Sequence, residues 1–250
     1  MSCGYFACDP STTACRTSCV DNSGCTITAR CNGAQVCAKR LRIALETSTG
    51  SCTRTESLPV VKTALEARGH TVTIVAGADI DTAGELASFD VVVSGSEACS
   101  GDDRSLYDTA LGPWVMAGGG LVGSGWVLFT APPANYGALM PNTGAAYLSG
   151  AQAVVPVGTH PIVTGLTGFT AQANYLPYGG APKQGSTPLM TTSANQEIAE
   201  AWQQGSGRVV FEGLLHIDSF SYANQSLTNG TNPMALEFLL RCIEWAGGGL

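Results

Sequence analysis

Charged side chains are scarce in this chain, because Asp, Glu, Lys and Arg together make up only 12% of its 250 residues. The net charge of −7 argues against nucleic acid and anionic membranes as partners, since both are themselves negatively charged. No apolar run reaches the roughly 18–20 residues of a membrane-spanning helix, so we expect no membrane span. Glycine is abundant, at 31 positions, and a surface of few charges and many small residues is typical of an extracellular protein.

Cysteine is scarce beyond residue 38, where only three of the ten occur, and dense before it. The spacing of the first seven is C-x4-C-x6-C-x3-C-x5-C-x5-C-x5-C, which contains no CxxC pair and no histidine. Structural zinc usually needs closely spaced ligands, so we expect disulfides here and no metal. The cysteines expected in disulfides are Cys3, Cys8, Cys15, Cys19, Cys25, Cys31, Cys37, Cys52, Cys99 and Cys242.

This distribution divides the chain into a disulfide-rich head, residues 1–38, and a body, residues 39–250. So small a head needs covalent staples, and disulfides persist in oxidising compartments, so we expect a secreted or cell-surface protein. The residues after Met1 are too few and too polar for an export signal, which we expect to lie outside these 250 residues. Because seven is odd, one head cysteine must pair with the body, pair with another chain or stay free.

Strand-like and helix-like segments alternate through the body. Strands are expected at residues 41–46, 70–75, 89–94 and 121–125, and helices at 58–68 and 102–117. This alternation indicates βαβ units and therefore a parallel sheet. The pattern loosens over residues 126–185, which we interpret as an insertion or as loops at one edge of the sheet. Residues 197–202 and 207–214 then predict an antiparallel hairpin, and residues 232–245 a closing helix.

Several motifs in this order resemble the ThuA-like (trehalose-utilisation) branch of the class I glutamine-amidotransferase-like superfamily. They are GGGLVG at 118–123, HPIVTGL at 160–166, GRVVF at 207–211 leading to His216, NP at 232–233 and IEWA at 243–246. The resemblance implies an α/β, flavodoxin-like three-layer sandwich with a mostly parallel sheet and any active site at the carboxyl ends of the strands. Residues 3–25 resemble the short cysteine-rich repeats found as spacers or appendages in secreted and surface proteins of myxobacteria and related bacteria.

The resemblance also locates a catalytic position on the sharp turn, or elbow, after the fourth strand. Amidotransferases of this fold carry a nucleophilic cysteine there, and ThuA-like members commonly carry histidine. In this chain Gly125 takes that position, which accepts the positive φ of an elbow but supplies neither nucleophile nor ligand. The neighbouring Ser124 should point to the other side of the strand end. His216 and Asp218 stand where triad amidotransferases carry His-x-Glu, a base and its orienting carboxylate.

Acidic and hydroxyl side chains gather at the expected strand ends, namely Glu46, Asp79, Asp81, Ser96 and Glu97. Together with His216 and Asp218, Glu46 and Glu97 could hold a divalent cation, or bind a polyol with Trp126 or Tyr136 as a stacking surface. The competing interpretation is that these side chains cap helices and turns, and that His216 bonds a loop carbonyl. His70, at the opposite edge of the sheet, and His160, before Pro161, are expected to be structural.

Two further disulfides are expected from the usual strand order 2-1-3-4. Cys52 and Cys99 follow neighbouring strands in that order, so we predict a disulfide between them that braces the loops over the elbow. A helix that follows a strand returns to the opposite edge of the sheet. Cys242, late in the closing helix, should therefore lie near the amino end of the first strand and pair with Cys37 or Cys31, which would resolve the odd count.

The leading functional hypothesis is a secreted or surface-attached, catalytically degenerate ThuA-like domain that acts as a binding or assembly module. Its expected partner is a carbohydrate or a protein at the cell surface, and no cofactor is expected. One alternative is a hydrolase or carbohydrate-active enzyme that uses His216 and Asp218 with Glu97 or Ser124. The other is a structural subunit of a fibre or surface layer, in which the chain self-associates through its head.

Overall fold

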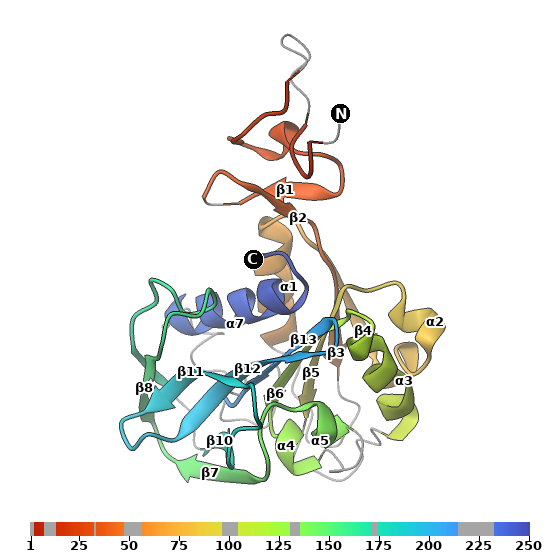
Figure 1. Cartoon of the computed structure of the whole chain (residues 1–250). Helices are drawn as coiled ribbons and strands as arrows, with labels where there is room; N and C mark the ends of the chain where they lie inside the picture. The colour runs from red at the N-terminus through yellow and green to blue at the C-terminus, as the bar shows by residue number, and fades with distance from the viewer. Residues whose placement is uncertain are drawn as a thin grey trace.

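A single mixed sheet forms the centre of the body, and among the described residues it has nine strands in the order β4-β3-β5-β6-β13-β12-β11-β8-β9 (Figure 1). The computed structural model describes residues 3–7, 14–32, 34–47, 57–96, 105–130, 136–171, 175–214 and 233–250. Neighbours are parallel from one edge as far as β13, through β4 (Thr71–Ala76), β3 (Arg42–Thr47), β5 (Val91–Ser96), β6 (Gly120–Gly125) and β13 (Gly207–Glu212). The first four strands in this order confirm the expected arrangement 2-1-3-4.

Short apolar runs produce the parallel half of the sheet, because its strands are covered by helices on both faces. Successive residues of a strand point to opposite faces, so Ile43 belongs to the core that includes Leu65, whereas Ala44 belongs to the core that includes Leu111. The first face carries α1 (Ser57–Ala67) and α7 (Pro233–Ala246), and the second carries α2 (Ala83–Leu86) and α3 (Ser105–Met116). These layers confirm the α/β, flavodoxin-like three-layer sandwich.

The other half of the sheet is antiparallel and larger than expected. The predicted hairpin is present as β12 (Glu197–Gln204) and β13, joined through Gly205 at a φ of +59°. The segment expected to be loops or an insertion supplies most of the additional strands, and Figure 1 shows them at the end of the sheet far from β4. They are β8 (Gln152–Pro156), β9 (Phe169–Ala171) and β11 (Thr187–Thr192), and a separate ribbon of β7 (Ala145–Ser149) and β10 (Tyr175–Gly179).

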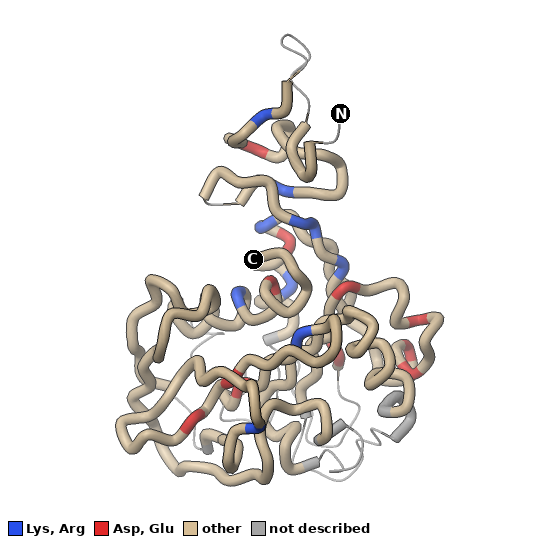
Figure 2. The backbone as a smooth tube through the Cα atoms, in the orientation of Figure 1, with Lys and Arg blue, Asp and Glu red and all other residues tan. Residues whose placement is uncertain are grey.

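The head contacts the body at the amino end of β3 through buried charged groups. Glu244 of α7 is only 2% exposed and accepts hydrogen bonds from Arg30 of β1 (Ala29–Cys31) and from Nε2 of His70, at 3.0 Å for His70. Nδ1 of His70 accepts the N–H of Leu41 at 3.1 Å, so His70 is the neutral tautomer that links the start of β3 to the same carboxylate of Glu244 that Arg30 of the head binds. This confirms its expected structural role, and Figure 2 shows the charges of both signs at this junction.

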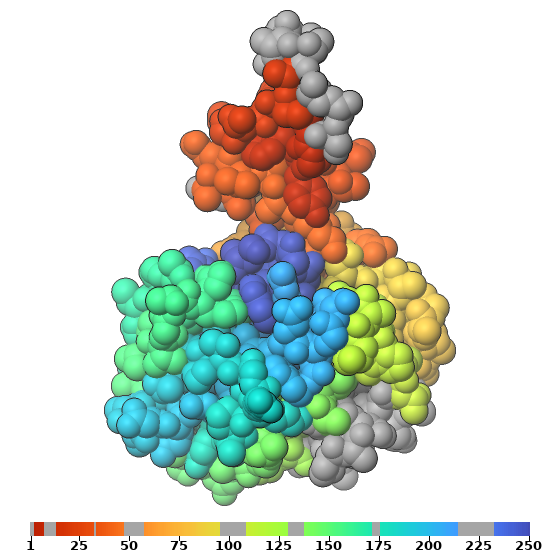
Figure 3. Space-filling model, in the orientation of Figure 1, coloured from red at the N-terminus to blue at the C-terminus, as the bar shows by residue number. Residues whose placement is uncertain are grey.

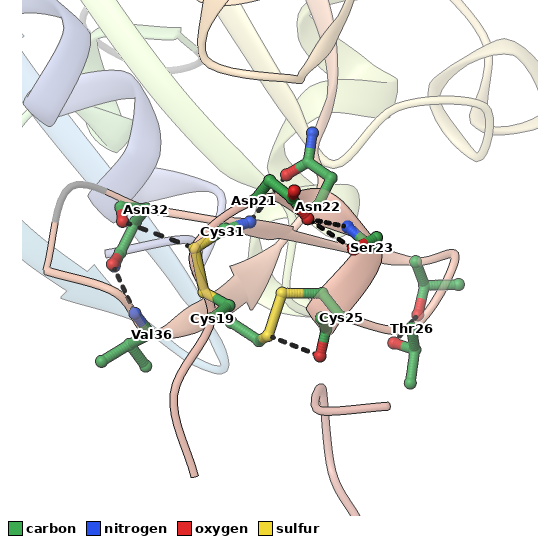
Figure 4. Close-up of a disulfide and its surroundings, with 12 residues drawn as sticks. Cys19, Asp21, Asn22, Ser23, Cys25, Thr26, Cys31, Asn32 and Val36 are labelled. Carbon is green, nitrogen blue, oxygen red and sulfur yellow. Dashed lines mark hydrogen bonds between the residues drawn. A yellow bond between two sulfur atoms is a disulfide. The ribbon is translucent and has the colours of Figure 1, made fainter. Parts of the chain in front are cut away.

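The described part of the head contains three disulfides, and the head projects from the body as a narrow extension (Figure 3). They join Cys3 to Cys15, Cys19 to Cys31 and Cys25 to Cys37, each across 12 residues of sequence. The loops that the last two disulfides close overlap in sequence, and together they include β1, the first residue of β2 (Cys37–Lys39) and the short helix η1 (Asn22–Gly24). In Figure 4 the side chain of Asn22 accepts the N–H of Cys31, and that of Asn32 accepts the N–H of Val36. The expected disulfide bonding of these six cysteines is confirmed.

The expected bond from Cys242 to Cys37 or Cys31 is wrong. Both head cysteines pair within the head, and Cys242 is a free thiol with no exposed surface. The reason is the helical period of 100° per residue, which turns positions two apart to nearly opposite sides of a helix. Glu244 faces the head, and so Cys242 faces the sheet. The prediction placed the right helix beside the head but used the wrong face of it.

None of the helices in the described ranges has the length and the apolar character that a membrane crossing requires.

Candidate functional site

The elbow after β6 has the geometry expected of a nucleophile turn but lacks the side chain. Gly125 ends the strand with a φ of +62°, in the left-handed region that glycine enters without steric cost. The chain then passes through Trp126 into α4 (Val127–Thr130). Beneath the turn, Met140 Sδ would lie 2.8 Å from a Cβ on Gly123, so this side of the elbow is already filled. The position that carries the nucleophile in related folds is therefore a buried glycine, which has no side chain to act as a nucleophile.

Ser124 lies on the face of the sheet that α7 covers. Val122 and Val210, two residues before Ser124 and Glu212, belong to the core under α1 and α7, and side chains two apart share a face. Ser124 and Glu212 are register partners on β6 and β13, and neither has exposed surface. The Glu212 carboxylate accepts the N–H of Leu214 at 2.9 Å. A substrate in solvent does not reach Ser124 in this arrangement.

Glu46 lies on the opposite face, inside β3 rather than after it. The register of β3 with β5 places it beside Ser94, whose hydroxyl donates a hydrogen bond to the Glu46 carboxylate. Glu46 is 6% exposed and Ser94 is fully buried. The sheet thus separates Glu46 from Ser124. Their buried polar groups form separate hydrogen-bonded sites and not one catalytic cluster.

An exposed aromatic cluster (Trp126, Phe129 and Tyr147) lies directly beside the glycine elbow. The ring centroid of Trp126 is 5.0 Å from that of Phe129 and 5.7 Å from that of Tyr147, in edge-to-face geometry that aromatic pairs favour. Phe129 is 42% exposed and Tyr147 is 50% exposed. Trp126 follows the elbow, Phe129 lies one helical turn later on α4, and Tyr147 comes from β7. The cluster presents apolar ring surface to solvent at the carboxyl edge of the sheet.

Comparison with known proteins identifies the fold of this chain. No family model and no curated protein matches the chain. Solved structures do match. A protein from Bacteroides uniformis described as ThuA-like has a TM-score of 0.60 to this chain at 12% sequence identity. The match covers 82% of this chain and 90% of the Bacteroides protein. The fold is that of ThuA-like proteins. A second ThuA-like protein, from Parabacteroides merdae, has a TM-score of 0.59 at 18% identity and covers 84% of this chain and 91% of its own.

The ThuA-like fold also occurs in a cytoplasmic protein of Salmonella typhimurium, with a TM-score of 0.59 at 12% identity. That match covers 82% of this chain and 98% of the Salmonella protein. These structures share the fold of the body, and they agree with the fold that the sequence motifs implied.

Several sequence-derived site residues lie outside the described residues of this ThuA-like fold. They are Glu97, His216, Asp218, Cys8, Cys52 and Cys99, so the predicted base pair and the Cys52–Cys99 bond stay predictions. Tyr136 begins α5 (Tyr136–Leu139), but its side chain is also outside the description. Asp79 has the capping role that was the competing interpretation, since its carboxylate accepts the N–H of Ala76 at 2.9 Å.

Metal ligation has one candidate among the described residues, and it lies in the head. Sulfur atoms of Cys19, Cys25 and Cys37 lie within 4.8 Å of one another. All three belong to the two interleaved disulfides, so their sulfurs are covalently bonded and not available as thiolates. This proximity follows from the stacking of two disulfides in a small core.

Sequence reasoning missed two features of this region, and the first is the aromatic cluster, of which it named only Trp126. The spacing of Trp126 and Phe129, three residues apart at the start of a helix, is the signal that could have identified the pair, whereas Tyr147 sits on a strand that was not predicted. The second is Glu200 of β12, which has no exposed surface and accepts a hydrogen bond from Asn142 Nδ2 at 3.3 Å. Burial raises the pKa of Glu200 to about 7, so this carboxyl is close to half-protonated at neutral pH.

Proposed function

We propose that this chain is a secreted or surface-attached domain of ThuA-like fold that has lost nucleophilic catalysis and binds carbohydrate at the carboxyl edge of its sheet. The observation that carries the proposal is the aromatic cluster beside a glycine elbow. An elbow without a side chain cannot form a covalent intermediate, and Ser124 is too buried to replace it. Exposed aromatic surface of this kind marks interaction sites, and flat rings stack on the apolar faces of sugars.

The head supports a location outside the cytosol. Three disulfides in a segment of fewer than 40 residues require an oxidising environment to form and persist. We propose a division between head and body at residues 38 and 39, with the head as an appendage that positions the binding edge. Figure 1 shows the head at one end of the strands of the sheet and α4 and β7, which carry Phe129 and Tyr147, at the other end, so a ligand at the cluster leaves the head accessible.

The test is retention of the chain by immobilised polysaccharides, with cellulose, xylan, starch and peptidoglycan as the probes. Replacing Tyr147 by alanine should weaken retention by the matching polysaccharide about tenfold, equivalent to ~1.4 kcal/mol, because stacking surface is lost. Tyr5→Ala is the matched control, since Tyr5 is a similarly exposed tyrosine (43%) in the head.

Two outcomes would overturn the proposal. The first is no retention by any of the polysaccharides, or equal loss in the Tyr147 and Tyr5 variants, which would remove the aromatic cluster as the binding surface. The second is release of sugar from a retained polysaccharide that disappears in a His216→Ala variant. That result would favour the alternative of a hydrolase that uses His216 and Asp218.

A further inference from the structure

A cavity of about 730 Å³ lies between the head and the body. It is near the amino ends of the parallel strands, whereas the aromatic cluster is near their carboxyl ends. The head contributes Arg30 and Asn32, and the body contributes Arg68, Glu237, Arg241 and Glu244. Figure 2 shows that most of the lysines and arginines in that view gather around this junction, although the whole chain carries a net charge of −7. The volume falls within the range of 300–1,000 Å³ typical of small-molecule sites.

The carboxylates of the cavity are already shared among several donors. Glu244 accepts from Arg30, from His70 and from Arg68, at 3.0 Å for Arg68. Glu237 accepts from Arg68 and from Arg241 Nε, at 2.7 Å for Arg241. His70 does not add a charge, because its Nδ1 accepts a main-chain N–H and burial lowers its pKa. Among these side chains, three guanidinium groups therefore face two carboxylates.

The guanidinium groups keep donors that the described residues do not use. Arg68 bonds only Glu244 and Glu237, and Arg241 bonds only Glu237 and the carbonyl oxygen of Thr164, whereas each guanidinium has five N–H groups. Both side chains are about one-quarter exposed and line the cavity. Arg30 is buried, and its Nε finds no acceptor within the described part of the chain. The side chains that line the cavity thus carry positive charge and unused N–H donors.

We propose that this cavity binds a small anionic molecule through its carboxylate, sulfate or phosphate oxygens. Arg68 and Arg241 bind the oxygens, because the forked N–H groups of arginine match the paired oxygens of these anions. Arg30 adds positive charge from the head side, so the ligand contacts head and body together. The site is independent of the proposed carbohydrate edge, since the sheet lies between them.

The experiment is isothermal titration of the full chain with citrate, sulfate and inorganic phosphate, at an ionic strength held constant with sodium chloride. At least one anion should bind saturably, and the preferred one identifies the acidic group of the natural ligand. Arg241→Gln should weaken that binding about tenfold or more. Arg42→Gln is the matched control, because Arg42 pairs with Asp90 outside the cavity and should leave the affinity unchanged.

A second variant separates loss of binding from loss of structure. Asn32→Asp keeps the side-chain oxygen that accepts the N–H groups of Ala34 and Val36, both at 3.0 Å, and adds a negative charge to the cavity wall. It should also reduce anion affinity while the thermal midpoint without anion stays close to that of the wild type. The proposal is overturned if none of the three anions binds saturably at millimolar concentration, or if the Arg241 and Asn32 variants bind as the Arg42 variant does.

Discussion

The head and the body of this chain are stabilised by different chemistry. Cystine supplies most of the core of the head, where the buried apolar residues of the described part are Cys19, Cys25, Ala29 and Cys37. The body is built on two layers of aliphatic and aromatic side chains, and its Cys242 stays a buried thiol. A segment of fewer than 40 residues cannot bury enough apolar surface, so covalent bonds replace it. The body has the size to fold on apolar burial alone.

The junction between head and body has a third kind of chemistry, which is buried charge. Glu244, His70 and Arg30 are each no more than 5% exposed. Burial alone would raise the pKa of Glu244, but the hydrogen bond from His70 and the charges of Arg30 and Arg68 together hold it below its ordinary value. Buried ionic contacts are weak sources of net stability, yet they are costly to break and restrict geometry. The junction is therefore where one substitution should have the largest effect.

Replacing Glu244 by glutamine should lower the free energy of unfolding by about 3–5 kcal/mol. The amide keeps the shape of the side chain but removes its charge, which leaves Arg30 buried without a counter-charge. Urea unfolding followed by circular dichroism measures the loss, and hydrogen exchange at β1 shows whether the head has loosened. Urea is preferred to guanidinium because it does not screen the charges.

Glu66→Gln is the matched control for that experiment. Glu66 forms an ion pair with Lys62 on α1, but its side chain is 44% exposed, so the change should stay within about 0.5 kcal/mol. Equal effects from the Glu244 and Glu66 variants would mean that burial of the junction contributes nothing to its strength.

The second prediction concerns the disulfides of the head. Replacing Cys25 and Cys37 together by serine opens a loop of 12 residues and should lower the stability of the head by about 3 kcal/mol. Hydrogen exchange at β1 and β2 should accelerate, while exchange in β5 and β6 stays the same. Cys242→Ala is the converse variant and should affect only the body, since Cys242 faces the sheet. Faster exchange in the head of the Cys242 variant would contradict this division.

The sequence was informative where one local rule decides the structure. Continuous apolar runs predicted β3, β4, β5 and β6, the turn residues predicted the β12–β13 hairpin, and the helical pattern predicted α1, α3 and α7. The strands between residues 145 and 192 were missed, because they are short, partly exposed and interrupted by residues such as Pro188. Their order depends on tertiary pairing at the edge of the sheet, which a local pattern does not contain.

The candidate sites show the same limit. The places of Gly125 and Trp126 could be predicted, since the GGGLVG motif locates the elbow and Trp126 is the next residue in the chain. Tyr147 reaches the aromatic cluster only through the placement of β7, and the cavity at the junction exists only because head and body dock. Cys242 was assigned the wrong partner because its partner depends both on which face of α7 carries it and on how the head packs against that helix. What could not be predicted was in each case a contact between segments far apart in sequence.

The body and the junction should also respond to acid in opposite directions. Burial lowers the pKa of His70, and the pKa of Glu244 is also lowered, so their contributions to stability are lost as pH falls. Glu200 behaves in the opposite way, because its pKa is raised from 4.5 to about 7. Its folded state favours the neutral carboxyl, so its contribution is fully present below pH 4.5 and is lost as pH rises toward 7.

Replacing Glu200 by glutamine isolates this smallest effect, because the amide mimics the neutral carboxyl at every pH. Between pH 4 and 6.5 the wild type should lose about 2 kcal/mol of stability relative to the Glu200→Gln variant, measured by urea unfolding at each pH. His70 and Glu244 titrate in both proteins, so their contribution cancels in the difference. A constant difference across this range would mean that Glu200 ionises normally and that the body, unlike the junction, is indifferent to pH. A stability difference between the two proteins that grows only as pH rises would show that Glu200 of the body and the charged groups of the junction respond to pH separately.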